Sequence, residues 1–579
     1  MRIITKTITI GLVLLCAYSL QAQTNIISTN PIAEEILTGN YNPTDYAASS
    51  MINHPDSIIH GVNDRINADS LRSFLESIVF FENRNTGSDT VSNTFGIGAA
   101  RRWGFSKFQQ FSLENENRLI PSYLQFDQTV CSMDQHRNVF AVLPGTDANG
   151  GVIIIEGHLD SRCDDECDSL CTANGAEDNG SGSALVVEMA RVMSKYTFEK
   201  TMVFMLTIGE EQGLIGADAF SLWATQKNIQ IKAVMNNDVI GGILCGETSS
   251  APSCPGLDNV DSTQVRIFSQ GVYNSQNKML ARYSKLQYNE ELRAIVDVPM
   301  MITIMTGEDR IGRGGDHIPF REDGFPAIRY TAANEHGNAD VGVDYNDRQH
   351  TIDDLIGVDT NNDMVIDSFF VDFNYLARNA VINGVTAGLI GNSPETPDFM
   401  VSSTDSLIFV EITSQTQYMN YRVAMRTTFT EWDTVYTITN GLSGNFSFIE
   451  NNTYHYISVA SVDEHGIESC FGEEQSVNRT TSIEEYLFDQ KVELLQNRPN
   501  PFDEATAISI LVHERFEHKE AYIRITDLTG KEIWRKEVEL NKGMIEVVYN
   551  HGYQATGQYL YSLIIDNNVI ATRSMVFAY

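Results

Sequence analysis

The chain has 579 residues, of which 42% are hydrophobic, and a formal net charge of −36. This length and apolar content are enough for several domains with buried cores. The negative charge argues against nucleic acid or an anionic membrane surface as a partner, because both repel an acidic protein.

The first residues have the pattern of a signal peptide. Arg2 and Lys6 precede an apolar run over 8–20, and the small residue Ala22 follows it. The run is too short for a membrane helix, which needs about 20 apolar residues, and no later stretch reaches that length. We therefore expect residues 1–22 to be removed from an exported protein that has no membrane span.

Residues 23–59 are polar and lack periodicity, so they are interpreted as an N-terminal arm or a propeptide. In 60–393, short apolar runs alternate with helical patterns, as in the strand over 152–155 and the helix over 183–193. This alternation predicts an α/β domain with a mostly parallel sheet and helices on both of its faces.

Three apolar runs lead directly into polar motifs. The runs cover 152–155, 202–206 and 231–235, and apart from Lys232 they have the continuous apolar character of strands buried in a parallel sheet. Ligands of such sheets bind at the carboxyl ends of the strands. The polar residues that follow the runs are therefore candidates for one site: His158, Asp160, Asp178, Glu210, Glu211 and Asp238.

The residue types in these motifs suit a hydrolytic Zn²⁺ ion or a similar divalent cation. Asp160 lies two residues after His158, where its carboxylate can accept the second N–H of the imidazole. Asp178 lies in a turn rich in Gly and Ser, where one carboxylate can reach two ions. Glu210 and Glu211 are expected on opposite sides of a strand end, so that one binds metal while the other acts as general base.

The motifs resemble those of the M28 family of zinc peptidases with two metal ions, most of which are aminopeptidases. The match covers about 60–393 and comprises G-H-L-D-S, A-E-D-N-G-S-G, G-E-E-Q-G-L-I-G-A, N-N-D, G-D-H-I-P-F, G-F-P-A and Q-H-T-I-D-D. The resemblance implies a zinc exopeptidase fold, two Zn²⁺ per chain and peptide substrates with free N-termini. It also implies a bridging role for Asp178, a general base in Glu210, and five metal ligands: His158, Asp178, Glu211, Asp238 and His350.

A second histidine, His317, could replace His350 as a ligand. It lies in an Asp-His-Ile-Pro sequence, whereas His350 lies in the His-Thr-x-x-Asp sequence that the family uses for its ligand. The resemblance therefore favours His350. It places His317 at a position that lines the substrate pocket in the family.

Seven cysteines remain beyond the signal peptide, and this odd number leaves at least one thiol free or paired externally. Cys163, Cys167 and Cys171 are spaced by four, which permits either a thiolate metal cluster or a loop held by disulfides. The acidic residues between them favour the disulfide loop. Cys245 and Cys254 flank a loop that contains two prolines and are the most plausible local bridge.

The segment from Asp359 to Asp363, followed by Asp367, contains several oxygen-bearing side chains. A calcium loop and an ordinary turn are both compatible with it. The segment lacks the glycine and the terminal glutamate of the calcium-loop pattern, which favours the turn.

Beyond a linker at 391–397, the pattern changes to short alternating strands. Residues 394–480 are predicted to form a β-sandwich and resemble fibronectin type III domains. Residues 481–579 are predicted to form a second small β-domain, which resembles the C-terminal sorting domain of the type IX secretion system. That resemblance implies contact with the type IX secretion machinery and a secreted or cell-surface protein; a plain adhesive β-domain is the alternative.

The leading hypothesis is a secreted zinc aminopeptidase in which Glu210 is the general base and Asp160 supports catalysis. A transferase similar to glutaminyl cyclases, with the same fold and paired glutamates, is a second hypothesis. A surface adhesin with an inactive peptidase domain is a third. The presence of the full set of five ligands favours hydrolysis with two metal ions.

Overall fold

The computed structural model describes most of the chain beyond the expected signal peptide. The described residues are 23–244, 260–271, 275–305, 307–309, 313–333, 348–404, 407–427, 431–449, 454–478, 491–502, 505–513, 520–527, 531–550, 557–566 and 568–577. The predicted signal peptide over 1–22 and the predicted bridge between Cys245 and Cys254 lie outside these residues.

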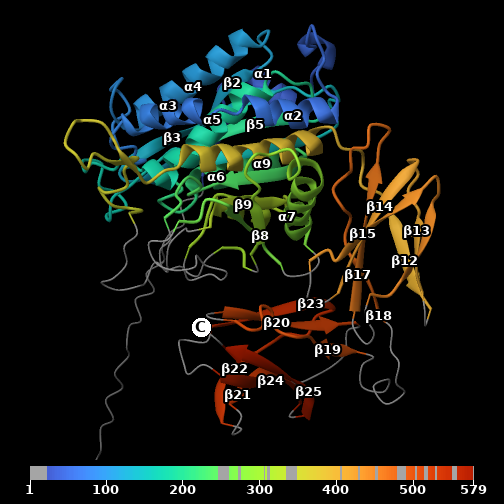
Figure 1. Cartoon of the computed structure of the whole chain (residues 1–579). Helices are drawn as coiled ribbons and strands as arrows, with labels where there is room; N and C mark the ends of the chain where they lie inside the picture. Colours follow the sequence, from blue (N-terminus) through green and yellow to red (C-terminus); the bar gives the residue numbers. More distant parts are fainter. Residues whose placement is uncertain are drawn as a thin grey trace, which may run out of the picture.

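One sheet of nine strands organises the first part of the described chain (Figure 1). The strand order across the sheet is β1-β2-β3-β5-β4-β6-β9-β7-β8. The strands are β1 (Thr24–Ser28), β2 (Ile120–Val130), β3 (Met133–Leu143), β4 (Val152–His158), β5 (Thr201–Thr207), β6 (Ile231–Asn237), β7 (Gln264–Phe268), β8 (Met301–Ile304) and β9 (Ala327–Ala332).

The centre of the sheet is parallel, because β4 pairs in parallel with β5 and with β6, and β6 pairs in parallel with β9. Antiparallel pairs flank this centre, so the complete sheet is mixed. The segment 23–59, predicted as an arm or propeptide, contributes the edge strand β1 to the sheet, antiparallel to β2.

Helices cover both faces of the sheet, as the alternating pattern predicted. One face carries a layer whose members pack against one another: α2 (Pro55–Arg65), α3 (Ala68–Val79), α4 (Gly96–Glu114), α5 (Gly182–Met193) and α9 (Phe373–Gly391). Elsewhere α6 (Ile215–Lys227) packs on β3 and on α8 (His317–Glu322), and α8 packs on β6 and β9. The remaining helices are α1 (Pro31–Leu37) and α7 (Gln276–Gln287), with short helical turns η1 (Pro43–Tyr46), η2 (Ala176–Ser181) and η3 (Tyr288–Leu292).

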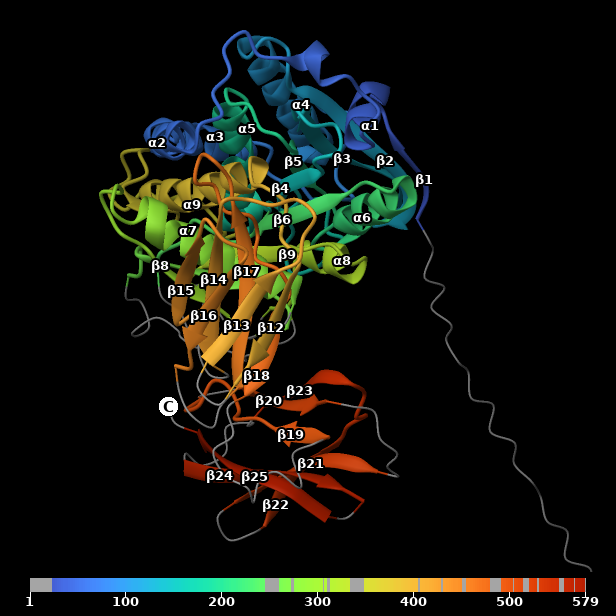
Figure 2. The ribbon, with the colours of Figure 1, turned by 90° about the vertical axis from the view of Figure 1, so that its right-hand side faces the viewer.

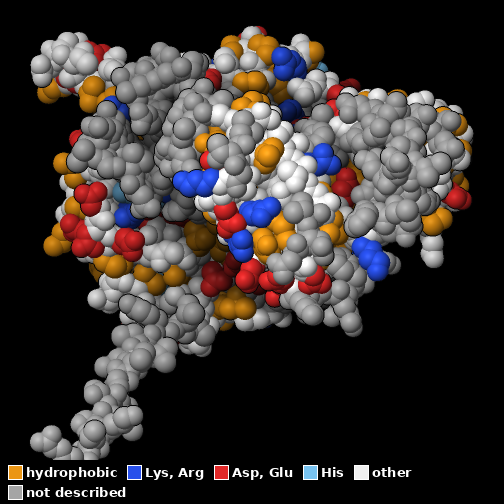
Figure 3. Space-filling view, turned by 90° about the horizontal axis from the view of Figure 1, so that it is seen from below, with side chains coloured by type: hydrophobic (Ala, Val, Ile, Leu, Met, Phe, Trp, Pro, Cys, Tyr) orange, Lys and Arg blue, Asp and Glu red, His pale blue; other side chains and the backbone are white. Residues whose placement is uncertain are grey.

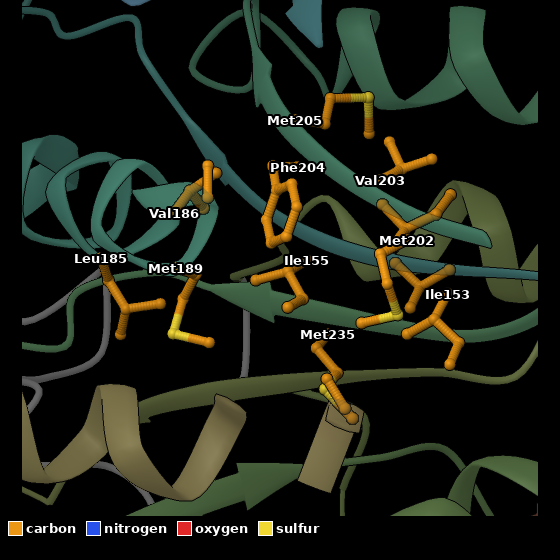
Figure 4. Close-up of a cluster of buried hydrophobic side chains, with 14 of the residues drawn as sticks. Ile153, Ile155, Leu185, Val186, Met189, Met202, Val203, Phe204, Met205 and Met235 are labelled. Atoms are coloured by element: carbon orange, nitrogen blue, oxygen red, sulfur yellow. The ribbon is translucent and has the colours of Figure 1, made fainter. Parts of the chain in front are cut away.

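The core lies between the central strands and the helix layer that contains α5 and α9 (Figure 4). Ile155 of β4, Phe204 of β5 and Met235 of β6 are fully buried beside Leu185 and Met189 of α5. Each fully buried side chain of this size contributes about 1.5–3 kcal/mol relative to an exposed one. The three strands that lead into the polar motifs are therefore among the most firmly held parts of the domain.

Two smaller β-sandwiches follow, each built from a three-stranded and a four-stranded antiparallel sheet. The first contains β12 (Phe399–Ser403), β13 (Leu407–Ile412), β14 (Asn420–Thr427), β15 (Thr434–Thr439), β16 (Ser443–Ser447), β17 (Tyr454–Val462) and β18 (Gln475–Asn478). The second contains β19 (Val492–Leu494), β20 (Ala505–Val512), β21 (Ala521–Asp527), β22 (Glu532–Glu537), β23 (Gly543–Asn550), β24 (Gly557–Ile565) and β25 (Asn568–Phe577). The predicted fold class, an α/β domain followed by small β-domains, is confirmed.

The first sandwich stands beside the α/β domain, and the second sandwich lies below it (Figures 1 and 2). Partly buried charge pairs join the three parts. Arg282 of α7 donates to Glu431 of the first sandwich at 2.7 Å, and Arg498 of the second sandwich lies 3.4 Å from the same carboxylate. The side chain of Arg282 is 1% exposed. The two arginines lower the pKa of Glu431 to about 2 against the effect of burial, which raises it.

From below, acidic and basic side chains lie intermixed with hydrophobic ones on this face of the molecule (Figure 3). Within the described residues, none of the helices combines the length and the apolar character that crossing a membrane requires.

The acidic turn that begins at Asp359 joins two very short strands, β10 (Gly357–Val358) and β11 (Ser368–Phe369). The Asp359 carboxylate accepts hydrogen bonds from the backbone N–H groups of Asn362 at 2.7 Å and Met364 at 2.6 Å. The Asp367 carboxylate accepts the Thr360 hydroxyl at 2.9 Å. The acidic side chains therefore hold the turn together, which supports the turn interpretation over the calcium loop.

Candidate metal centre

The structure brings all seven predicted site residues to the carboxyl ends of the central strands. His158 is the last residue of β4, and Asp238 directly follows β6. Asp178 lies in η2, immediately before α5. The other predicted residues reach the same place from the loops after β4 and β5 and from a turn that precedes β10: Asp160, Glu210, Glu211 and His350.

Six of these side chains form two adjacent groups. The first group contains His158, Glu210 and Asp238, and the second contains Asp178, Glu211 and His350. Within each group, one potential ligand atom from each residue lies within 4.8 Å of the others.

Asp178 connects the two groups through its two oxygens. Its Oδ1 lies 3.1 Å from Nε2 of His158, and its Oδ2 lies 3.1 Å from Nε2 of His350. Asp238 Oδ1 lies 3.3 Å from His158 Nε2, and Glu211 Oε2 lies 3.1 Å from His350 Nε2. A carboxylate that faces both histidines has the geometry that a bridging ligand needs.

Glu210 and Glu211 do not extend a strand, because β5 ends at Thr207 and the chain turns at Gly209, which has a φ of 71°. The prediction that they point to opposite sides of a strand end is therefore wrong. Both glutamates line the same cavity, and they differ in where they lie within it. Glu210 Oε2 is 4.0 Å from His158 Nε2, farther than the carboxylates of Asp178 and Asp238.

Asp160 has a wider role than the predicted contact with His158. The His158 Nδ1 atom lies 3.1 Å from the backbone carbonyl of Asp160 and 3.5 Å from its carboxylate. That carboxylate also accepts the backbone N–H of Glu211 at 3.2 Å and of Glu210 at 3.4 Å. Asp160 is fully buried and thus fixes both the histidine and the turn that carries the two glutamates.

A further carboxylate, Asp354, orients the bridging residue. It accepts the backbone N–H of Glu177 at 2.8 Å and of Asp178 at 3.0 Å. Asp354 ends the Q-H-T-I-D-D motif that also contains His350. The motif was recognised from the sequence, but this supporting contact requires the folded chain, since 176 residues separate the two aspartates.

His317 does not belong to either group. It is buried at the start of α8, and its Nε2 atom lies 2.9 Å from the backbone carbonyl of Glu308. Burial lowers the pKa of His317 to about 4, so the ring is neutral at ordinary pH. Of the two candidate histidines, only His350 contacts the carboxylates of the centre.

The cluster is strongly coupled by charge. Burial lowers the pKa of His158, but Glu210 and the neighbouring aspartates outweigh it, and the net shift is well upward. Burial raises the pKa of Asp178, whereas hydrogen bonds from His158 and His350 lower it well below its usual range. For Glu210, burial is the largest cause of a pKa raised well above the ordinary value. The charged forms of these buried carboxylates are therefore stable only with positive charge close to them.

The donor set fits two divalent cations. The carboxylates and imidazoles are the oxygen and nitrogen ligands that Zn²⁺ takes in hydrolytic sites. Glu211 Oε1 is buried and has no hydrogen-bond partner within the described structure. Burying an unpaired carboxylate oxygen costs free energy unless a cation binds it. The bridging position of Asp178 matches one ion on each side.

The centre opens into a cavity of about 310 Å³. Besides the candidate ligands and Glu210, its wall includes Arg162, Leu214 and Gln349. Arg162 was missed by the sequence analysis. It lies directly before Cys163, where a loop closed by the disulfide between Cys163 and Cys171 begins.

A second disulfide joins Cys167 of that loop to Cys131, beside the turn between β2 and β3. The three closely spaced cysteines therefore hold a loop through disulfides, as the acidic residues between them suggested, and do not form a thiolate cluster. Cys470 is a free cysteine within the described residues.

Comparisons with known proteins agree with this geometry. Residues 138–365 match the model of a family described as Peptidase family M28. A protein of Leptosphaeria maculans named "Probable zinc metalloprotease" is 30% identical over 393 residues, which cover 65% of this chain and 87% of that protein.

Two solved structures illustrate the range of similar folds. The Legionella pneumophila LapA aminopeptidase is 17% identical with a TM-score of 0.43, over 60% of this chain and 78% of that chain. The glutaminyl cyclase of Porphyromonas gingivalis is 18% identical with a TM-score of 0.37, over 56% of this chain and 97% of that chain.

Proposed function

The chain belongs to peptidase family M28, in which similar proteins are named probable zinc metalloproteases, and we propose that it is an aminopeptidase with two zinc ions. The observation that supports this proposal most strongly is the position of Asp178 between two groups of ligands, one on each of its oxygens. A centre with a single ion would not need a second group of ligands around His350.

In this proposal, His158 and Asp238 would hold one ion, Glu211 and His350 would hold the other, and Asp178 would serve both. The bound ions would polarise the scissile carbonyl and activate a water molecule. Asp160 and Asp354 keep the ligands in place through the backbone and ring contacts described above. Such supporting contacts fix the orientation of ligands and preserve metal affinity.

Glu210 is the proposed general base. It lines the cavity beside both groups. Its Oε2 atom lies farther from His158 Nε2 than the carboxylate oxygens of Asp178 and Asp238 do. A carboxylate in this place can accept a proton from the attacking water and deliver it to the leaving amine. Burial raises its proton affinity, which suits a group that must hold the proton between the two steps.

A set of three substrates tests the proposed activity against its alternatives. We expect hydrolysis of a chromogenic aminoacyl amide, no hydrolysis of its N-acetylated form, and no cyclisation of a peptide with N-terminal glutamine. Cyclisation without hydrolysis would support a transferase similar to glutaminyl cyclases. Inactivity toward all three, in protein that contains zinc, would support the adhesin hypothesis.

We also propose that the enzyme is exported by two signals. The apolar N-terminal run supports removal of 1–22, and the resemblance of 481–579 to type IX sorting domains supports processing outside the cell. Residues 394–480 are proposed to be a fibronectin type III-like domain. Mass spectrometry of the extracellular protein from its native culture tests both ends, and an intact C-terminus at Tyr579 would contradict the sorting proposal without affecting the enzyme.

A further inference from the structure

Arg162 contacts two of the proposed ligands, although the proposed mechanism gives it no role. Its Nε atom donates to Glu211 Oε2 at 2.8 Å, and its Nη2 atom lies 2.7 Å from His350 Nδ1. Its Nη1 atom donates to the backbone carbonyl of Asp164 at 3.2 Å. The side chain is 16% exposed. A positive charge therefore lies against two of the three side chains of the second group.

The surrounding loop holds Arg162 in this place. The disulfide between Cys163 and Cys171 starts at the next residue, and the disulfide from Cys167 ties the same loop to Cys131. On the other side of Arg162, the hydroxyl of Ser161 donates to the carbonyl of Ala173 at 2.7 Å. The guanidinium can move by rotating its own side chain, but its backbone is fixed.

A guanidinium is an unusual neighbour for a metal-binding histidine. When the imidazole binds a metal through Nε2, its proton lies on Nδ1, and the usual partner there is a carboxylate or carbonyl that accepts it. Arg162 offers only N–H donors. Metal binding at His350 would therefore place two donors against each other at Nδ1, and the same ion would compete with Arg162 for Glu211.

The first group has a different arginine environment. Arg329 lies 3.2 Å from Asp238 Oδ2, but it also pairs with Asp309 at 2.7 Å, which balances its charge. Among the described residues, Glu211 is the only carboxylate that Arg162 contacts. The positive charge at the second group is therefore offset only by a residue that the ion itself needs.

We propose that Arg162 is a positioning residue that makes the two metal positions unequal by competing with the second ion for Glu211 and His350. The position formed by Asp178, Glu211 and His350 then fills last and empties first. This inference rests on the ligand roles in the proposed function. It goes beyond them because it assigns a cause, within this chain, to a difference between the two ions.

Zinc affinities of the full mature chain, measured by competition with a chromogenic chelator, test the proposal without any assay of hydrolysis. The wild type should show one tight and one weaker ion. Arg162→Gln should bind the weaker ion about 10–100-fold more tightly, because removal of a unit charge a few ångströms from a cation is worth this much even in a well-screened site. The tighter ion should gain less, since Arg162 contacts neither His158 nor Asp238 and the charge–charge repulsion weakens with distance.

Arg72→Gln is the matched control, because Arg72 Nε donates to Glu76 at the same 2.8 Å on the exposed surface of α3. It should leave both affinities unchanged. Arg162→Lys keeps the charge on a side chain that cannot bridge both ligands, and it should tighten the second ion by less than the glutamine variant does. A gain in affinity at one position is not expected from structural damage, which would weaken binding.

A second-ion affinity that is unchanged or weaker in Arg162→Gln would overturn the proposal. If that variant fails to fold, judged by its circular dichroism, the neutral Arg162→Met decides in the same way. If no form of the protein binds zinc, the metal centre itself is refuted together with this inference. If two ions bind with the expected pattern but no peptide is hydrolysed, only the proposed activity fails.

Discussion

Replacement of each of the neighbouring glutamates by glutamine should have different consequences, although both lose one negative charge. Glu210→Gln keeps the shape of the side chain but removes the group that accepts the proton. Because general-base catalysis contributes about 10²–10⁴-fold, kcat should fall by that factor, equivalent to about 2.7–5.5 kcal/mol in the barrier. Zinc content and KM should change little, since the Glu210 carboxylate lies farther from His158 than those of Asp178 and Asp238.

Glu211→Gln should instead weaken metal binding. Its Oε2 atom lies 3.1 Å from His350 Nε2, and its side chain is 3% exposed, so the lost charge cannot be replaced by solvent. We expect one ion to be lost at low zinc and part of the activity to return with excess zinc. Bound zinc and kcat are measured together for both variants. If Glu210→Gln keeps both ions and nearly full activity, Glu210 is not the base.

Three further predictions concern the ligand choice, the domain contacts and metal loading. His350→Ala should lose about one zinc per chain by elemental analysis, whereas His317→Ala should keep both ions because its ring contacts a backbone carbonyl; the opposite pattern would exchange their roles. Glu431→Gln should destabilise the chain by up to about 3 kcal/mol at pH 7, because folding lowers the pKa of Glu431 from 4.5 to about 2. The stabilising free energy of the charged carboxylate is fully present above pH 4.5 and is lost as the pH falls toward 2. Thermal unfolding of mutant and wild type should therefore converge near pH 2, and a difference that persists there would contradict the ion-pair explanation. Apparent zinc affinity should rise with pH between about 6 and 9, because the proton on His350 must leave before the metal binds. Burial lowers the pKa of His350, but Glu211 and Asp178 outweigh that effect and raise it to about 9. A flat profile by chelator competition would argue against this histidine as a ligand.

The position of the site could be predicted from the sequence because its strands carry an unusually clear signal. The run before His158 is apolar on both faces, and every residue of β4 is buried. The run before Asp238 has the same character apart from the exposed Lys232. Such runs identify central strands, and the carboxyl ends of parallel strands meet at one edge. His350 was identified only through the resemblance. It lies in a turn, and no periodic pattern in the sequence connects that turn to the centre.

The local geometry of the two glutamates could not be predicted in the same way. Extrapolating the strand through Glu210 and Glu211 ignored Gly209, whose positive φ ends the extended backbone. The glycine was visible in the motif, and its tolerance of left-handed backbone could have signalled a turn. Which way the turn faces depends on Asp160, whose carboxylate binds both backbone N–H groups.

Contacts between distant segments left no signal in the sequence. Arg162 and Asp354 reach the centre only because loops fold over it, and an isolated arginine in an acidic loop is most simply interpreted as a solvated side chain. The contact of Arg282 with Glu431 joins residues 149 positions apart in different domains. Periodicity reports which face of an element is buried, but it does not report which partner covers that face.

Stepwise zinc titration of the chelated enzyme, with turnover of an aminoacyl amide measured at each step, tests the central claim most directly. A centre bridged by Asp178 should bind two equivalents, and most of the activity should appear as the second equivalent binds. Glu210→Gln should follow the same binding curve with its turnover lower by about 10²–10⁴-fold. Full turnover with a single equivalent, or two bound equivalents with no hydrolysis of any aminoacyl substrate, would contradict the claim that this chain is an aminopeptidase with two zinc ions.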